Sequence, residues 1–367
     1  MCLALLTVIG FFIFTIVVKN NVTLAEQWTR GFARSYVTAF SKATSKIPVS
    51  ITEISFIVVV ISCVVFLAWG FSLLGNKKVW GFVHRVMMIV LVITGAITMY
   101  NATFGIAYSR APLVLEKYEG EVVKEEIKGI ATYFVEDCND CLDQMNMNEN
   151  GEILVNYSKK ELIEKIRNEY DKLTDDYYHP YTPTAKGLFT SGWFTSVGIV
   201  GMYFGVLGEA HYNTHMTNAE LPFSIAHEMA HGKGVAREDD AQLVALYICL
   251  NSDEPLLRYS AYLYTIDRMI SLTHFTGVDT DYKEVWSKMD GRFYKNVNYI
   301  NDYWKGDMFL YDLGNKINDW YLKTFGEKTG TASYDDTPTE VDPVDQKIYL
   351  SHYQSLYYKN YFDHIDK

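Results

Sequence analysis

The sequence predicts a mostly helical chain of the α+β class, in which three N-terminal transmembrane helices precede a soluble, mainly helical domain with a small β element. Three observations predict this architecture. Long apolar runs are concentrated in the first 110 residues. The remainder shows apolar side chains mostly at helical spacing. Residues 179–222 are the exception, because their glycine, threonine and aromatic residues are typical of loops and short strands.

Charge divides the chain at the same place. The first 110 residues carry nine Lys and Arg but only two acids, Glu26 and Glu53, which gives about +7. Since the whole chain has a net charge of −11, the remainder carries about −18. A basic, apolar front and an acidic, polar back indicate a membrane anchor and a water-exposed domain. The acidic domain argues against nucleic acid as a partner, because phosphates would be repelled.

Three apolar runs form the expected anchor in the lipid bilayer. Residues 1–18, 54–75 and 79–108 are each predicted to be a transmembrane helix, because a bilayer core needs about 20 mostly apolar residues per helix. The second run meets this length cleanly, and the third is interrupted early by His84 and Arg85. The first run could instead be a signal peptide. It has no small-residue cleavage site and no basic start, so a retained helix is the preferred interpretation.

The loops between these runs predict the orientation in the cell membrane. The short loop with Lys77 and Lys78 is basic and should be cytoplasmic, which places the soluble domain, residues 110–367, outside the cytoplasm. Residues 19–52 are also basic and would then lie outside, so the two loops favour opposite orientations. The Lys77–Lys78 pair is given more weight. Residues 19–52 are predicted to be an amphipathic or interfacial loop along the membrane surface.

The soluble domain is expected to consist of helices around a short β element. Residues 112–178 are charged and have apolar positions at helical spacing, which predicts helices. The segments VGIVGMYF and GEAHYNTHM are the predicted strands. Helical spacing returns at Pro222, and Gly232 or Gly234 can end that helix. A second helix is predicted for REDDAQLVALYICL; further helices continue to about Phe325, and a last one is predicted for YLSHYQSLYYKNYF.

The segment AHEMAHGKGVARE carries the residues that indicate chemistry. On a helix, residues four apart share one face, so His227 and His231 can point two imidazoles at one ion. Zinc favours such nitrogen ligands and, in catalytic sites, keeps one position open for water. Glu228 would lie beside the ion and could accept a proton from water as general base. The HExxH pattern therefore predicts a zinc-dependent hydrolase.

A helix with two surface histidines is the alternative interpretation, because HExxH also occurs by chance. The surroundings argue against it. Ala226, Met229 and Ala230 make the helix apolar around the motif, and a buried histidine pair without a partner would be costly. An acidic third ligand is also available close by in the sequence.

The third metal ligand is predicted to be Glu238, which opens the following helix. Asp239 and Asp240 are the alternatives; they could instead cap the helix or accept a hydrogen bond from a ligand histidine. A related zinc pattern has a glycine three residues after the second histidine and then a third histidine. Gly234 fits that glycine, but Arg237 occupies the ligand place and arginine cannot bind zinc.

These motifs resemble a bacterial family of membrane proteins, the domain-of-unknown-function family 3810. The similar segments are VGIVGMYFGVLGEAHYNTHM, LPFSIAHEMAHGKGVAREDDAQLVALYICL, LRYSAYLYTIDRM and INDWYLKTFGEKTGTASY. The resemblance implies three N-terminal spans followed by an external, zincin-like domain, and a membrane-bound gluzincin-like metalloprotease without a named substrate. Asp240 and Gln242 depart from the family, which usually has glutamate and asparagine at these places, so Asp240 stays open as the third ligand.

The predicted reaction is hydrolysis of a peptide or protein substrate. A donor for the oxyanion is needed besides the metal, and the candidates are Tyr203, His211, His215 and Tyr259. None of these four is singled out by its spacing. The segment GEAHYNTH could align an extended peptide by β-addition, if it lies beside the active helix.

Two other classes of function remain in view. The protein could bind zinc without catalysis, as a sensor, receptor or envelope scaffold. A purely structural site needs no base such as Glu228 and is closed by a fourth protein ligand, which is not obvious here. A transporter is disfavoured, because the spans contain almost no ionisable groups. Cys138 and Cys141 form a lone CxxC without a second pair, so a local disulfide or two ordinary thiols are expected.

Overall fold

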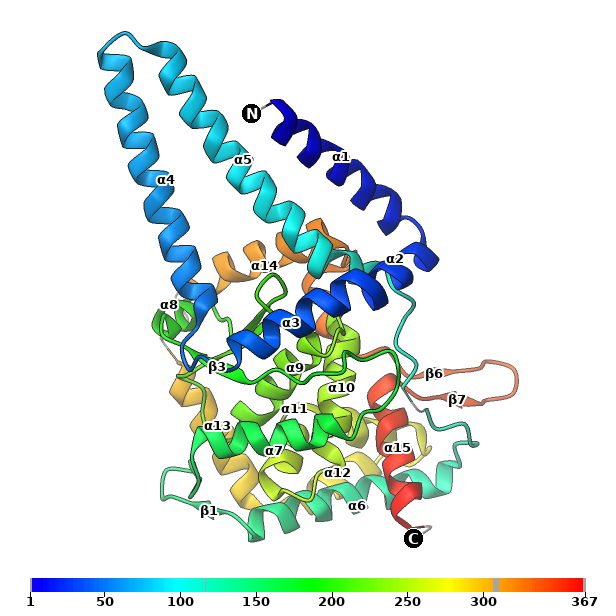
Figure 1. Ribbon diagram of the computed structural model, residues 1–367. Helices are drawn as coiled ribbons and strands as arrows, with labels where there is room; N and C mark the ends of the chain where they lie inside the picture. The colour runs from blue at the N-terminus through cyan, green and yellow to red at the C-terminus, as the bar shows by residue number, and fades with distance from the viewer. Residues whose placement is uncertain (1, 116, 306–309, 366–367) are drawn as a thin grey trace.

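Two long antiparallel helices project from the mainly helical body of the protein (Figure 1). The computed structural model describes residues 2–115, 117–305 and 310–365. The projecting helices are α4 (Ile51–Gly75) and α5 (Val79–Thr103), and a third helix, α1 (Cys2–Lys19), packs along α5. The hairpin leaves the body and returns to it, so both of its open ends lie at the same face of the body.

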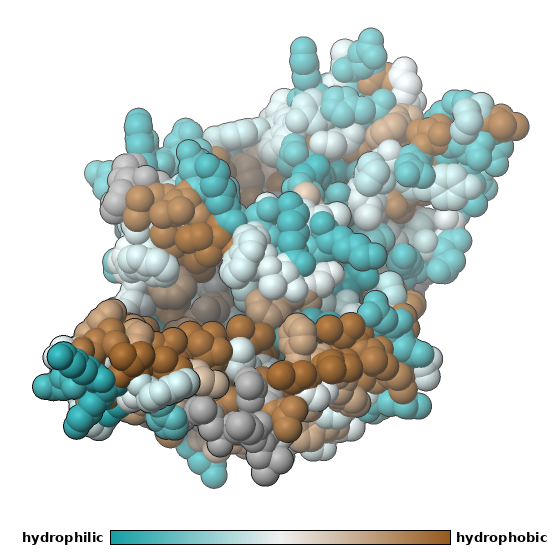
Figure 2. Space-filling model, turned by 90° about the horizontal axis from the view of Figure 1, so that it is seen from above, coloured by the Kyte–Doolittle hydropathy of each residue, from teal (hydrophilic) through white to brown (hydrophobic). Residues whose placement is uncertain are grey.

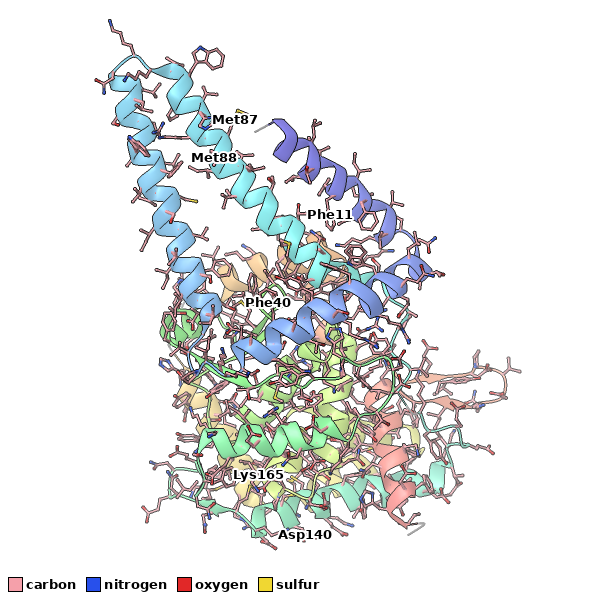
Figure 3. The ribbon with its side chains drawn as sticks, in the orientation of Figure 1. Phe11, Phe40, Met87, Met88, Asp140 and Lys165 are labelled. Atoms are coloured by element: carbon pink, nitrogen blue, oxygen red, sulfur yellow. The ribbon has the colours of Figure 1, made fainter. Side chains whose placement is uncertain are left out.

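Among the described helices, α4 and α5 are long and apolar enough to cross a membrane, with 25 residues each. At 1.5 Å per residue such a helix is about 37 Å long, which exceeds the roughly 30 Å hydrocarbon core of a bilayer. Figure 2 shows apolar residues gathered in a band along the projecting helices, whereas most of the remaining face is hydrophilic. In Figure 3 the side chains along most of the hairpin, including those of Met87 and Met88, lie outside the body. These features indicate membrane association.

The expectation of three equivalent spans is supported for two. The first apolar run forms α1, but α1 counts as a third span only together with the helical segment Val22–Thr44, which it meets at a bend of 119°. The third run is shorter than predicted. Its helix ends at Thr103, and a 3₁₀ turn, η2 (Gly105–Ser109), follows inside the body.

The segment between the first two runs is helical, which corrects the predicted loop at residues 19–52. It forms α2 (Val22–Trp28), a π-helical turn, η1 (Thr29–Ala33), and α3 (Arg34–Thr44). α3 lies across the body at the foot of the hairpin (Figure 1). The Ser41 hydroxyl donates to the Gly208 carbonyl at 2.8 Å and so holds α3 against the body.

A three-stranded sheet has the order β3-β5-β4. β5 (Glu209–Asn213) pairs with β3 (Ala185–Leu188) in parallel and with β4 (Gly201–Phe204) antiparallel. The segments predicted as strands contain β4 and β5, whereas β3 was not predicted. β5 is buried along its whole length, and α9 (Leu221–Gly232) packs against the sheet.

The core of the body is built by α9 and α10 (Glu238–Leu250), which pack against each other and against α11 (Pro255–Ser271). The predicted boundaries of α9 and α10 agree with the structure. The last predicted helix is α15 (His352–Ile365). The remaining elements are α6 (Lys124–Asp143), β1 (Asn146–Met147), β2 (Ile153–Leu154), α7 (Lys159–Asp171), α8 (Ser191–Ser196), η3 (Leu272–Phe275), α12 (Asp281–Trp286), α13 (Gly291–Trp304), α14 (Tyr311–Phe325), η4 (Gly330–Tyr334), β6 (Glu340–Val341) and β7 (Ile348–Tyr349).

A buried ionic cluster joins α4 to the sheet. The Glu209 carboxylate on β5 pairs with the Lys186 ammonium on β3, and both side chains are almost fully buried. The same carboxylate accepts the backbone N–H groups of Ile51 and Thr52 at 3.3 and 2.8 Å. These N–H groups lie in the first turn of α4, where they lack helical partners and favour a negative charge. The foot of the hairpin is thereby fixed to the strand that packs beside α9.

Candidate metal centre

The local sequence explains why α9 ends where it does. Pro222 stands in the first turn, where its missing N–H removes no helical hydrogen bond. At the other end Gly234 adopts a φ of +92°, and the Val235 N–H donates to the Ala230 carbonyl at 3.2 Å. This is the glycine-dependent C-cap in which the residue after the helix is left-handed. The turn reverses the chain, so that α10 begins beside the final turn of α9.

Three ligand atoms converge at this reversal. The Nε2 atoms of His227 and His231, one helical turn apart, lie 3.2 Å from each other. The Glu238 Oε2 atom, on the first residue of α10, lies 3.1 Å from His227 Nε2 and 3.3 Å from His231 Nε2. All three residues are buried, and the group could hold a metal ion.

The spacing fits a tetrahedral ion of the size of zinc. Ligand atoms 2.0–2.1 Å from such an ion are about 3.3–3.4 Å apart. The three measured separations, 3.1 to 3.3 Å, are close to this value. The donor atoms also suit a cation, because two imidazole nitrogens and a carboxylate oxygen face one point. With three protein ligands, a fourth position would stay open for water.

Hydrogen bonds at the far side of each imidazole bear on its orientation. His231 Nδ1 lies 2.7 Å from the Val235 carbonyl, to which it can donate, leaving the Nε2 lone pair toward the group. His227 Nδ1 is buried, and among the described residues it has no hydrogen-bond partner. The Oε1 atom of Gln242, one turn along α10 from Glu238, is likewise buried and unpaired within the described chain. Burial lowers the pKa of His227, and Gln242 lies close enough to oppose this shift in part.

The charges of the group are coupled. Burial opposes a charge on Glu238, but the two imidazoles outweigh it and hold the pKa of Glu238 well below its usual range. Burial likewise opposes a charge on His231, and the Glu238 carboxylate outweighs it, so the pKa of His231 rises to about 9. Burial lowers the pKa of His227.

Glu228 lies beside the group but does not join it. Burial raises the pKa of Glu228 to about 8, and its Oε2 atom has no hydrogen-bond partner among the residues that the structure describes. Its carboxylate reaches β4 at Gly201, where a Cβ atom would lie 2.5 Å from Glu228 Oε1. Glycine at this place therefore makes room for the Glu228 side chain between α9 and β4.

Aromatic side chains from three parts of the chain cover the group. The Phe104 ring, directly after α5, meets the His231 ring edge-on at a centroid distance of 5.7 Å. The Tyr108 hydroxyl donates to Glu238 Oε1 at 3.4 Å. Tyr203 of β4 lies 6.2 Å from the His231 ring, and Tyr334 of η4 lies 6.1 Å from the His227 ring.

The structure separates the alternatives for the third ligand. Glu238 lies with the histidines, whereas Asp239 pairs with Arg237 at 2.7 Å. Asp240 accepts the Leu113 N–H at 3.3 Å and does not belong to the group. Asp240 departs from the pattern of the family that the sequence resembles, but this departure does not affect His227, His231 or Glu238.

Of the four predicted oxyanion donors, Tyr203 is placed beside the group. The His211 ring instead faces the Ser50 hydroxyl at 3.0 Å, at the foot of α4. His215 lies 3.4 Å from the Thr195 hydroxyl, and the Tyr259 hydroxyl donates to Asn296 at 2.9 Å. Sequence reasoning did not single out Tyr108, Tyr334 or Phe104, because they come from segments that only the fold brings to α9.

The strand that was expected to align a peptide has neighbours on both of its edges. The segment GEAHYNTH contains β5, which is the central strand and is paired on both sides. Its backbone is therefore engaged, and Glu209 and His211 point to the foot of α4. Of the described strands, β4 is the one at the edge of the sheet next to Glu228.

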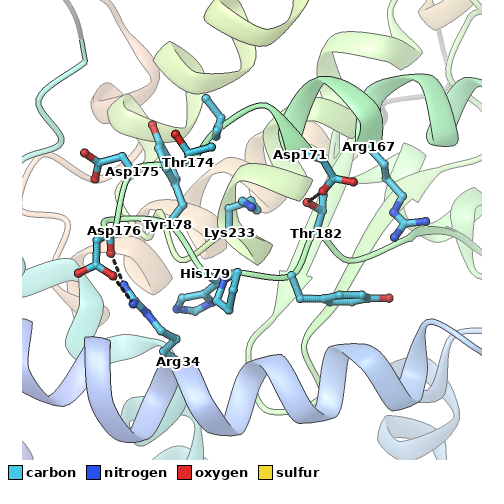
Figure 4. Close-up of a pocket in the computed structure, with 13 residues that line it drawn as sticks. Arg34, Arg167, Asp171, Thr174, Asp175, Asp176, Tyr178, His179, Thr182 and Lys233 are labelled. Atoms are coloured by element: carbon cyan, nitrogen blue, oxygen red, sulfur yellow. Dashed lines mark hydrogen bonds and ion pairs between the residues drawn. The ribbon is translucent and has the colours of Figure 1, made fainter.

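A cavity of about 670 Å³ lies at a different place, beyond the end of α9 (Figure 4). Its lining includes Arg34, Arg167, Asp171, His179 and Lys233, and most of these side chains are ionic. None of the described residues of the metal group or Glu228 lines it. The lone CxxC is likewise separate, since Cys138 and Cys141 are free, buried thiols on α6.

Comparisons with known proteins give one family. The family model described as "Protein of unknown function (DUF3810)" matches residues 28–339. This range includes every residue of the metal group and the whole of α4 and α5. No curated protein and no solved structure matches the chain.

Proposed function

The chain belongs to DUF3810, a family whose function is unknown, and we propose that it is a membrane-anchored, zinc-dependent peptidase of the gluzincin type. One observation carries the proposal. The ligand atoms of His227, His231 and Glu238 converge within 3.3 Å of one another, and a buried, unpaired carboxyl group, Glu228, lies beside them within the described structure. A site that only stabilises the fold has no need of that fourth group.

Zinc is the proposed ion because the ligand set suits it. Two imidazole nitrogens and one carboxylate oxygen are the ligands of zinc hydrolases that keep one position open. When bound, zinc polarises the scissile carbonyl and lowers the pKa of water toward neutrality. His227, His231 and Glu238 would hold the ion, which would displace the proton that Glu238 favours on His231, so binding would release a proton.

Glu228 is the proposed general base. Its burial in an apolar site makes it a stronger proton acceptor than a solvated carboxylate, since the pKa is raised to about 8. A nearby cation would lower this value again and leave the carboxylate ionised at neutral pH. Glu228 would then accept the proton of the attacking water and deliver it to the leaving amine.

Tyr334 is the proposed donor to the oxyanion. Its ring lies 6.1 Å from the His227 ring. Burial raises the pKa of its hydroxyl, and the charges of Glu238 and Glu228 raise it further. The hydroxyl therefore stays protonated near the reacting groups and can donate a hydrogen bond to developing negative charge. Tyr108 is less suited, because its hydroxyl already donates to Glu238.

β4 is the proposed guide for the substrate backbone. It lies at the sheet edge beside α9, and Gly201 is in direct contact with Glu228. An extended peptide that pairs with this edge would lie along the active helix, with its scissile bond near Glu228. The partners are thus a peptide or protein substrate and the lipid bilayer, and no nucleic acid is expected, given the acidic body.

The proposed location is the cell membrane, with the body outside the cytoplasm. Lys77 and Lys78 lie in the turn between α4 and α5, at the end of the hairpin farthest from the body (Figure 1). Basic residues at that turn favour the cytoplasmic side, which puts the body on the opposite side.

A catalytically silent zinc protein, acting as a sensor or scaffold, is the second candidate. The observation in its favour is the burial of the site, since His227, Glu228, His231 and Glu238 are each at most 8% exposed. A sensor needs no access for a peptide, whereas a peptidase requires that part of the aromatic cover moves.

Peptide cleavage separates these candidates. Full-length protein in detergent is incubated with zinc and a quenched fluorescent peptide library, as wild type, Glu228→Gln and Glu164→Gln. Glu164 on α7 is the control, because it lies outside the metal group, pairs with Arg167 and has a side chain that is 46% exposed. The peptidase proposal predicts cleavage by wild type and Glu164→Gln, with a loss of about 10²- to 10⁴-fold in Glu228→Gln. Zinc binding without any cleavage in all three would support the silent protein.

A further inference from the structure

α14 has an apolar outer face that the described part of the body leaves uncovered. Leu313, Ile317 and Trp320 are 50, 51 and 66% exposed. Their spacing of four and three residues places them on one face of the helix. Gly314 and Leu322 are the buried residues of α14, and the spacing of Leu322 places it opposite the apolar face. The more apolar face of α14 therefore points away from the core, which is the reverse of the usual arrangement in an amphipathic helix.

α14 lies beside the ends of the helices that project from the body. Its Tyr321 hydroxyl is hydrogen-bonded to the Tyr100 hydroxyl in the last turn of α5. The Phe325 ring packs edge-on against the Tyr100 ring at 4.5 Å, and the Phe325 carbonyl accepts from Lys19 Nζ at 3.1 Å. α14 thus lies where α5 and α1 enter the body (Figure 1).

A second, partly exposed aromatic surface lies on the α2–α3 segment, where Phe32 and Phe40 are 46 and 38% exposed and Trp28 and Tyr36 are half-buried. Trp28, Phe32, Tyr36 and Phe40 follow each other at intervals of four, with ring centroids 4.3 to 5.8 Å apart. We call these four side chains the aromatic flank. Because Trp28 Nε1 donates to the Ala102 carbonyl at 2.8 Å, the flank begins beside the last turn of α5.

The α2–α3 segment contacts the projecting helices on one side and the body on another. Trp28 packs on Phe14 of α1 at 5.0 Å, which puts the aromatic flank on the side of the projecting helices. Arg34 instead pairs with Asp176 of the body at 2.7 Å. The segment therefore divides its surface between the body and the region around the hairpin.

We propose that the outer face of α14 and the aromatic flank of α2–α3 rest in the interfacial layer of the bilayer and form a collar around the foot of the membrane hairpin. Lipid is the occupant that the surroundings favour, because both surfaces adjoin the end of α5, the helix that leaves the body to cross the membrane. Tryptophan and tyrosine side chains concentrate at this layer, and amphipathic helices bury their apolar faces in it.

The collar places the metal group close to the membrane surface. Phe104 is the first residue after α5, and its ring touches the His231 ring. Tyr108, four residues later, donates to Glu238. At 1.5 Å per helical residue, the group lies within about two turns of the end of the membrane helix. α14 and η4, which carry Tyr321 and Tyr334, close the same site from another direction.

This location defines the substrate class, in an inference that rests on the proposed peptidase activity. The substrate is a polypeptide segment that emerges from the same bilayer, as in the membrane-proximal part of an anchored protein. Such a segment reaches the site along the surface that the collar occupies. A freely diffusing peptide lacks this confinement and the effective concentration that confinement provides.

The seating of α14 is tested by spin labels, without reference to activity. Full-length Ile317→Cys and Leu154→Cys proteins are labelled and placed in phosphatidylcholine–phosphatidylglycerol vesicles, with wild type as the background for native thiols. Leu154, on β2, is a matched control that is 46% exposed; β2 pairs with β1, which lies at the end of the body away from the hairpin (Figure 1). Ile317 is expected to be accessible to oxygen and shielded from a water-soluble nickel chelate, and Leu154 the reverse. Equal chelate accessibility at both sites would overturn the collar.

The substrate class is tested separately with Ile317→Glu/Trp320→Glu. One reporter peptide is used twice, anchored to the vesicles by a transmembrane helix and free in solution. The double variant should lose about tenfold or more of the cleavage of the anchored form and keep that of the free form, with unchanged zinc content. Equal loss on both forms would overturn the substrate class. Cleavage of neither form by wild type, with Ile317 in lipid, would reject the peptidase and leave the collar standing.

Discussion

At the scale of single residues, the pKa values of two glutamates in one buried site are shifted in opposite directions. Burial raises the pKa of Glu228 to about 8. Burial acts on Glu238 in the same direction, but the two imidazoles within 3.3 Å reverse it and lower its pKa. The difference comes from position on the helices and not from residue type. This difference supports the proposed roles, in which Glu238 binds the ion and Glu228 accepts a proton.

The first prediction concerns Gln242. Gln242→Leu is expected to weaken zinc affinity by about 10- to 100-fold, because the Nδ1–H of a zinc-bound His227 would lose its nearest side-chain acceptor. Competition with a fluorescent chelator measures the affinity. Asp239→Asn, which removes the acid paired with Arg237 in the same turn of α10, is the control and should bind zinc as wild type does. Equal affinities in all three proteins would remove Gln242 from the site.

The second prediction concerns the oxyanion. Tyr334→Phe should lower kcat by about 10²-fold or more, while KM and zinc content stay close to wild type, because the hydroxyl acts on charge that develops during the reaction. Steady-state kinetics on a peptide found in the library screen measures both constants. Tyr203→Phe is the companion variant, since its hydroxyl is also buried near the site. A loss in Tyr203→Phe alone would reassign the donor to Tyr203.

The sequence could predict the residues whose relation is local. His227, Glu228 and His231 follow from helical spacing, and Glu238 follows from a glycine turn of fixed length. Tyr334 could not be predicted, because 103 positions separate it from His231 and no short pattern marks the contact. Seven tryptophans and 28 tyrosines make such residues too common to single out by type.

At the scale of elements, the contact of β4 with α9 decides the room available to the base. The third prediction is that Gly201→Ala retains zinc and loses most of its peptidase activity. The added Cβ would lie 2.5 Å from Glu228 Oε1 and 2.6 Å from its Cγ, so the carboxylate must move. Gly129→Ala on α6 is the control, where a Cβ meets nothing within 4 Å and alanine favours the helix. Full activity in Gly201→Ala would mean that Glu228 need not occupy this position.

Elements differed in how far the sequence predicted them. α9, α10 and α15 have long apolar periods, and their existence was predicted. β3 was not, because its four residues, AKGL, include lysine and glycine and have no alternation. Lys186 in that strand is buried only because Glu209 and two backbone carbonyls receive its ammonium group. A buried lysine of this kind cannot be recognised before its partner is known.

At the scale of the whole molecule, the ionic cluster between Lys186 and Glu209 couples the hairpin to the body. Burial would raise the pKa of Glu209, but His211, Lys186 and Thr52 outweigh it and lower the value from 4.5 to about 2. A carboxyl group with a depressed pKa stabilises the fold above its unfolded value and loses this contribution as pH falls toward the folded value. The contribution, about 3 kcal/mol from this shift, should therefore disappear between about pH 4.5 and pH 2.

The fourth prediction tests this coupling. Glu209→Gln should lower the Tm in detergent at pH 7 and reduce the fall in Tm that wild type shows below pH 4.5. Adding Lys186→Met should restore part of the loss, because an unpaired buried ammonium is costlier than an apolar side chain of similar size. Scanning fluorimetry of the three proteins between pH 3.5 and 7 measures it. Identical pH profiles in wild type and Glu209→Gln would show that the cluster contributes nothing.

The division into a membrane anchor and an acidic body was predictable from composition, because burial in lipid and exposure to water select different residues. The distance between the two parts was not. More than a hundred positions lie between the end of α5 and α9, and this separation along the chain does not show how closely the two helices approach each other. The structure places Phe104 against His231, and the length of chain between two elements does not limit how closely they pack.

The zinc content of the full-length protein tests the central claim most directly. The whole chain is required, because Tyr108 contacts Glu238 of the site and the foot of α4 contacts the sheet that supports the site. Wild type, Glu228→Gln and Glu238→Ala are purified in detergent, dialysed against trace zinc and measured by mass spectrometry of the metal. We expect one zinc per chain in wild type and Glu228→Gln, and much less in Glu238→Ala. A folded wild-type protein that binds no zinc would contradict the account and leave HEMAH as a buried helix with two histidines.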